Sequence, residues 1–318
     1  MAEGKWIHGL SPGMPVADAA RVALAARLEV VRQYLPLAAS RPYENVEYVH
    51  QLRVGTRRAG AALRVFGTCL PRKHLRAAKQ SLRGLRRAAG DARDWDVFLL
   101  ALAAARGDDP ADRPAFDFLA GYALGERSAA QTRLAAAADD VGPRFAADTA
   151  VLPGHVRPPR GADAPATFGD LAAEQMTALF AEFARAVSAD PAGPDALHQL
   201  RILGKRVRYA MELFAPCFTD AFRTELYRAV VALQEALGEV QDAAVGRARL
   251  EALRDRVKMV APGDWPRFEP GVGRLLRGHE AAFAAGRDRF AAWRSEWAAA
   301  WAAHPPRLLA DAVAAEVR

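Results

Sequence analysis

Two stretches of this chain combine a histidine with closely spaced cations. Residues 49–58 read VHQLRVGTRR, and residues 197–206 read LHQLRILGKR. In each stretch, cations follow the histidine by three, seven and eight residues, and neither stretch contains an acid. An imidazole binds anions or transfers protons near neutral pH, and a guanidinium pairs with two oxygens of one phosphate or carboxylate. The stretches therefore indicate either an anion-binding site or histidine chemistry.

Helical spacing places the cations of each stretch on one face. At about 100° per residue, the apolar side chains of residues 49–66 share one side of a helix, and the histidine and cations share another. The first basic face holds His50, Arg53, Arg57 and Arg64. The matching face of the second copy holds His198, Arg201, Lys205 and Arg208. Each histidine is thus one member of a row, and it either contacts the anion or orients a group of the bundle.

A longer row of cations follows the first stretch. It consists of Arg72, Arg76, Lys79, Arg83 and Arg86, with Arg87 beside it. On a helix this row is about 22 Å long. Like charges three or four residues apart destabilise a helix by roughly 0.2–0.5 kcal/mol per pair, so the row costs about 1–2 kcal/mol. A cost of that size in a marginally stable chain predicts an external anion that offsets it.

The charge of the whole chain favours the same interpretation. The chain has 318 residues, is 51% hydrophobic and carries a net charge of +7. Residues 50–93 hold twelve cations and one acid, so the remainder is net negative. A positive excess confined to one segment is typical of proteins that bind a polyanion. No apolar run approaches the ~18–20 residues that span a bilayer, and no signal peptide is recognisable, so we expect a cytoplasmic protein without a membrane partner.

The sequence is helical in pattern and internally repeated. Apolar residues recur with a helical period, and positions 148 residues apart match without a gap, among them Phe66 and Phe214, and Cys69 and Cys217. This predicts an all-α fold of two pseudo-symmetric halves, each resembling a four-helix bundle. The predicted segments are an N-terminal tail (1–15), a first helical repeat (16–140), a linker (141–166), a second helical repeat (167–303) and a C-terminal tail (304–318).

The second copy does not repeat the longer row of cations. The positions that match it hold Asp220, Thr224, Tyr227, Val231, Gln234 and Glu235. The two halves therefore differ in charge, and we expect the first half to contribute more to anion binding.

A metal site is the alternative interpretation of the histidines. Glu47 precedes His50 by three residues, as Asp195 precedes His198, and Glu-x-x-His pairs bind metals in some helix bundles. Such a site also needs carboxylates from two further helices, whereas the neighbouring helix offers cations. The helix dipole by itself favours an acid in the first turn. We expect no metal and no cofactor, since the chain also lacks a Walker loop and an acidic Mg²⁺ cluster.

Together these motifs resemble the CHAD family, which is named for conserved histidines in an α-helical domain. The resemblance rests on VHQLRVGTRRAGAALRVF and LHQLRILGKRVRYAMELF, together with LRGLRRAAGDARDWDVF and its weaker copy LQEALGEVQDAAV. It extends over about residues 16–303. It implies two facing helical bundles whose basic helices bind inorganic polyphosphate, and association with polyphosphate granules.

The resemblance also implies binding without catalysis. CHAD domains are often fused to a triphosphate-processing domain, which these 318 residues do not include. Two alternatives remain. One is a nucleic-acid-binding protein, because the same charge attracts DNA or RNA at least weakly and without specificity. The other, less favoured, is a metal-dependent polyphosphate hydrolase or phosphotransferase.

Overall fold

A computed structural model describes residues 5–161 and 164–303, without the side chains of residues 298–303. The predicted C-terminal tail, 304–318, lies outside the described residues. Within the described ranges the chain is helical and has no β-strand, which confirms the all-α fold. The helices are α1 (Val16–Ser40), α2 (Glu47–Val65), α3 (Arg72–Ala105), α4 (Arg113–Val151), α5 (Phe168–Ser188), α6 (Pro194–Phe214), α7 (Tyr227–Val260) and α8 (Trp265–Ala303).

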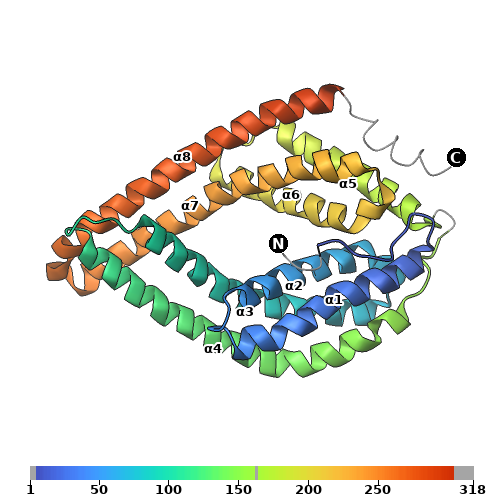
Figure 1. Cartoon of the computed structure of the whole chain (residues 1–318), viewed down its shortest axis with the longest axis horizontal. Coiled ribbons are helices and arrows are strands. Elements are labelled where there is room, and N and C mark those ends of the chain that lie inside the picture. Colours follow the sequence, from blue (N-terminus) through green and yellow to red (C-terminus); the bar gives the residue numbers. More distant parts are fainter. Residues whose placement is uncertain (1–4, 162–163, 304–318) are drawn as a thin grey trace.

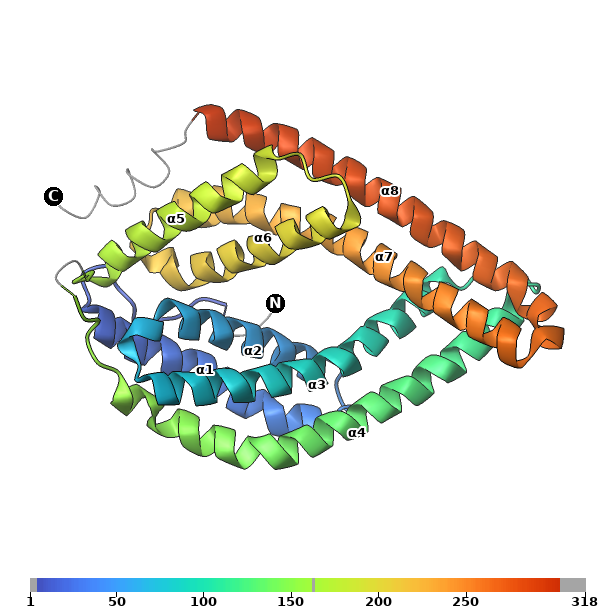
Figure 2. The same ribbon diagram turned by 180° about the vertical axis from the view of Figure 1, so that it is seen from behind.

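The helices form two groups of four that follow the chain order. Figures 1 and 2 show α1–α4 on one side of the molecule and α5–α8 on the other. One core cluster draws buried residues from both groups. The Phe168 ring of α5 lies 6.1 Å from Phe66, at the end of α2, and 5.4 Å from Phe214, at the end of α6. Two phenylalanines that are 148 residues apart thus pack on one side chain between the halves.

The two halves meet a second time at the far ends of their longest helices. In both views the ends of α3 and α4 lie beside α7 and α8 (Figures 1 and 2). The Arg249 guanidinium of α7 lies 4.0 Å from the Trp95 ring centroid of α3. A separate apolar cluster covers this junction and contains Phe98, Leu102, Phe116, Leu119, Leu250, Leu253, Val272 and Leu275. The halves are therefore held together at two well-separated places.

The segment predicted as a linker is partly helical. Helix α4 continues to Val151, so the prediction that a linker begins at residue 141 is wrong. Pro143 lies inside this helix at an exposed position, whereas Phe145 and Thr149 are buried. Burying an aromatic side chain contributes about 2–3 kcal/mol, which is comparable to the cost of one internal proline. Packing against the core therefore overrides the composition that is typical of a linker.

The segment predicted as an N-terminal tail packs onto the bundle where it is described. Ile7 and Leu10 are buried in the main core cluster. The Met14 carbonyl accepts a hydrogen bond of 2.8 Å from the Phe168 backbone N–H. Residues 5–15 therefore connect the start of α1 to the start of α5 in the other half.

A buried ion pair joins α2 to α6 at the first junction. The Arg58 Nε of α2 donates to the Glu212 Oε2 of α6 over 2.6 Å, and the two side chains are 7% and 1% exposed. The Tyr227 hydroxyl donates to the other carboxylate oxygen over 2.8 Å. The Arg208 guanidinium lies 3.9 Å from that same oxygen. One buried carboxylate thus holds cations from both basic helices.

Replacing this carboxylate should destabilise the whole fold. We expect Glu212→Ala to lower the free energy of unfolding by about 3–5 kcal/mol, because it leaves buried positive charge without its counter-ion. Chemical denaturation measures the loss. Glu29→Ala is the matched control, because it removes an exposed Arg–Glu pair on α1 and should cost about 0–1 kcal/mol. Equal losses in the two variants would contradict the role assigned to Glu212.

Candidate anion-binding site

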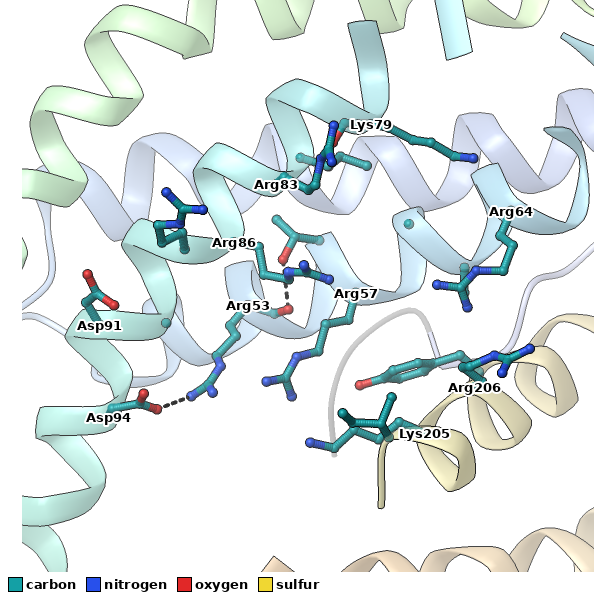
Figure 3. A pocket seen from close by; sticks show the side chains of 18 residues that line it. Arg53, Arg57, Arg64, Lys79, Arg83, Arg86, Asp91, Asp94, Lys205 and Arg206 are labelled. Carbon is teal, nitrogen blue, oxygen red and sulfur yellow. Dashed lines mark hydrogen bonds and ion pairs between the residues drawn. The ribbon is translucent and has the colours of Figure 1, made fainter. Parts of the chain in front are cut away.

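A cavity of about 750 Å³ lies between α2, α3 and α6. Its lining is dominated by arginine and lysine, and Figure 3 shows their side chains converging from the three helices. The lining cations are Arg53, Arg57, Arg64, Lys79, Arg83, Arg86, Arg87, Lys205 and Arg206. The acids in the lining are Asp91 and Asp94. Helices from both halves therefore form one strongly positive wall.

Helical packing explains why these cations face the cavity. Leu52, Ala59 and Leu63 are fully buried on the opposite side of α2, as the helical period predicted. On α3, Leu82 and Leu85 anchor the helix, and the cations around them remain exposed. Burial of the apolar stripe fixes the rotation of each helix, so the basic stripe has to point into the space between them.

Seven of the predicted site residues line this cavity, and six do not. Those in the lining are Arg53, Arg57, Arg64, Lys79, Arg83, Arg86 and Lys205. Those outside it are His50, Arg72, Arg76, His198, Arg201 and Arg208. Arg72 and Arg76 lie on the first turns of α3, beyond the cavity, and both are exposed. The other four belong to the partly buried layer on α2 and α6.

The two histidines lie outside the cavity lining, and neither adds positive charge to it in the way that the arginines do. His198 Nδ1 lies 2.6 Å from the Gln241 Oε1 of α7, so this ring joins two helices of its own half. Burial, together with the positive charge of Arg93, lowers the pKa of His50. A neutral imidazole adds no charge to the row at neutral pH. The observed contacts favour the orienting role of His198 over anion contact.

Sequence reasoning missed two members of the lining, Arg206 and Tyr209, and placed Arg87 only beside the row of cations on α3. Arg206 follows Lys205 directly, and the basic pair is visible in the sequence, but the helical period alone assigns only one of the two to the basic face. Because the lining is formed by three helices, both Lys205 and Arg206 of α6 belong to it. Nothing local to Tyr209 signals its place, because it depends on how α6 packs against α2.

The Lys205 side chain is partly buried among other cations. Burial, and then the positive charges of Arg201, Arg57, Arg53 and Arg208, lower the pKa of Lys205 to about 7. A lysine normally keeps its proton to far higher pH, because its ammonium is solvated; here burial disfavours the charged form most, and the four neighbouring cations disfavour it further. The wall is therefore suited to take up an anion from outside.

Two ion pairs tie cavity arginines to acids at the rim. Arg53 donates to Asp94 of α3 over 2.7 Å, and Arg206 donates to Glu182 of α5 over 2.8 Å. All four side chains keep contact with solvent, so these pairs are weak and exchangeable. Most of the lining cations make no such pair within the described residues.

The described residues contain no group of three or more histidine, cysteine or carboxylate side chains placed to hold a metal ion. Glu47 and Asp195, the acids of the metal alternative, are both exposed in first helical turns. The two cysteines are buried and do not form a disulfide; each lies in a 3₁₀ turn that follows a basic helix, Gly67–Cys69 and Ala215–Cys217. No described helix has a segment apolar and long enough to cross a bilayer.

The model of the CHAD domain matches residues 22–251 of this sequence, which is most of the chain. The chain belongs to the CHAD domain family. This CHAD chain has the same fold as the CHAD domain from the plant Ricinus communis, with a TM-score of 0.62, 23% identity, and coverage of 87% of this chain and 93% of that one. It is also similar to PptA from Streptomyces chartreusis, with a TM-score of 0.68, 22% identity, and coverage of 89% and 99%. No curated protein sequence matches it.

The lowered pKa of Lys205 predicts how the stability of this CHAD protein changes with pH. Its pKa is about 7 in the folded chain and 10.5 as the ordinary value. Between these values the unfolded chain binds more protons, so the contribution of Lys205 to stability rises with pH. From about pH 6.5 to about pH 9 the wild type should gain about 2 kcal/mol relative to Lys205→Met, as measured by urea unfolding. An unchanged difference between the two proteins would contradict the assignment.

Proposed function

We propose that this protein binds inorganic polyphosphate in the basic cavity and does not turn it over. The observation that carries the proposal is the wall of nine cations and two acids formed by α2, α3 and α6. A linear polyanion with closely spaced charges matches a row of arginines that lines one cavity. The chain also belongs to the CHAD family, and the resemblance to that family implies the same ligand.

The arginines suit a ligand made only of phosphate. A planar guanidinium pairs with two phosphate oxygens at once, and charge-assisted hydrogen bonds of this kind are about twice as strong as neutral ones. Ligand binding also offsets repulsion within the wall, where the charges of Arg201, Arg57 and other cations add to burial in lowering the pKa of Lys205. The favourable free energy of binding therefore includes the repulsion between cations that the anion removes.

The cavity is less suited to nucleic acid. Base recognition in single strands relies on aromatic side chains on which bases stack, and the lining holds one aromatic side chain, Tyr209. The Tyr209 ring lies under the Arg208 guanidinium, 4.9 Å from it, and the side chain is buried. Such a ring offers little open face to a base. Phosphate contacts alone would give DNA or RNA weak, salt-sensitive binding.

Catalysis has little support from the lining side chains. Hydrolysis of a phosphoanhydride needs a group that orients or deprotonates water, usually beside bound metal ions. Of the two acids in the cavity, Asp94 is engaged by Arg53, and Asp91 lies exposed at the rim. We therefore favour a binding role, with granule association as its cellular consequence.

Charge reversal in the cavity should weaken polyphosphate binding. We expect Arg83→Glu combined with Arg86→Glu to raise the Kd for long-chain polyphosphate by about tenfold or more, because both side chains project into the cavity. Isothermal titration calorimetry measures the change. Arg133→Glu with Arg287→Glu makes the same change in net charge at exposed positions of α4 and α8, outside the cavity lining. If both double variants lose affinity equally, the cavity is not the site.

Competition and turnover separate this proposal from its rivals. We expect duplex DNA at equal phosphate concentration to displace little bound polyphosphate at physiological salt. Efficient displacement would favour the nucleic-acid alternative. Incubation of polyphosphate with the protein and Mg²⁺ or Mn²⁺ should release no phosphate above the rate without protein. Release that is lost in His50→Ala would instead show an enzyme.

A further inference from the structure

The charge of the cavity changes along its length. At one end, Asp91 and Asp94 of α3 face the cavity beside Arg53, and Figure 3 shows both carboxylates on that side. Toward the opposite end the lining holds Arg64, Lys79 and Arg206, with no acid among the lining residues there; Glu182, which accepts from Arg206, lies outside the lining. The cavity therefore has an acidic end and a basic end.

The acidic end includes a contribution from the second half. Burial raises the pKa of Asp242 on α7, and the negative charge of Asp94 adds to this rise against the opposing effect of Arg201 and Lys205. A carboxylate of α7 thus lies within electrostatic range of Asp94. A phosphate chain that advanced past Arg53 would meet this negative charge, which opposes extension in that direction.

The basic end continues beyond the cavity. Toward the N-terminus of α3, the stripe that includes Lys79 continues with Arg76 and Arg72, about 10 Å further along the helix. Both arginines are exposed and lie outside the lining. Neither makes a side-chain hydrogen bond or ion pair within the described part of the chain. Both positions are thus open to an anion that leaves the cavity at this end.

We propose that a bound polyphosphate chain leaves the cavity between Arg64 and Lys79 and continues over Arg76 and Arg72, which form an outer subsite for chains longer than the cavity. This inference rests on the proposed function, and it adds a direction and a dependence on chain length to it. Tripolyphosphate, held among the inner cations, does not reach the outer subsite. A long chain engages both.

The outer subsite is tested by removing its two charges. We expect Arg72→Gln combined with Arg76→Gln to raise the Kd for long-chain polyphosphate roughly three- to thirtyfold, on the scale of two exposed charge pairs. The Kd for tripolyphosphate should stay unchanged. The dependence of long-chain affinity on salt should also become shallower, because fewer cations are neutralised by the chain. Arg133→Gln with Arg287→Gln is the control for net charge, and thermal melting verifies that each variant is folded.

The outcomes separate the two proposals. Wild-type protein that binds neither tripolyphosphate nor long-chain polyphosphate would overturn the proposed function. Binding of both, with no effect of the Arg72 and Arg76 changes on the long chain, would overturn the outer subsite alone. An equal loss for tripolyphosphate and the long chain would also overturn it, because the two arginines would then act on the inner cavity. Restored long-chain affinity in Arg72→Lys with Arg76→Lys would support it.

Discussion

The arrangement of the whole molecule depends on the buried carboxylate of Glu212. Helices α2 and α6 each carry a row of cations, and two such helices repel each other when they pack side by side. Glu212 lies at their contact and accepts hydrogen bonds from Arg58 and Tyr227. Its negative charge also acts on Arg27 of α1 and on Lys5 of the N-terminal segment. One acid on an otherwise apolar face thus allows the two halves to meet.

Glu212 does not balance the positive charge that faces the cavity. Glu212 neutralises cations beneath the helix contact, whereas Arg57, Arg86 and Lys205 face the cavity without an equivalent acid. Moving carboxylates into the cavity would stabilise the empty protein, but those carboxylates would then compete with phosphate for the arginines. Binding sites commonly lower the stability of the ligand-free protein in this way, because the same groups are needed for function.

Helical periodicity predicts the rows of cations, and non-local packing decides which of them meet. The apolar stripe of α2, from Leu52 to Leu63, indicates the direction of its basic face from local spacing alone. The partnership of α2 with α6 joins residues more than 140 positions apart, and no local pattern specifies it. Glu212 carries a readable signal, since a lone acid on an apolar stripe has to be paired, but nothing in the sequence identifies Arg58 as its partner. Around Pro143 the local composition predicts a linker, but the chain there is helical because Phe145 is buried in the core.

The burial of neutral side chains explains why the second half does not repeat the cavity of the first. Gln234 of α7 occupies the position that matches Arg86, and Gly204 of α6 matches Thr56. The Gln234 side chain is buried, and its Nε2 donates to the Arg201 carbonyl over 3.3 Å. A Cβ at Gly204 would lie 2.3 Å from that nitrogen, so the glycine permits α6 and α7 to close around the amide. A neutral side chain can be buried between two helices, whereas an arginine there would need a counter-ion. The space that α2 and α3 leave open to an anion is therefore filled by the protein itself between α6 and α7.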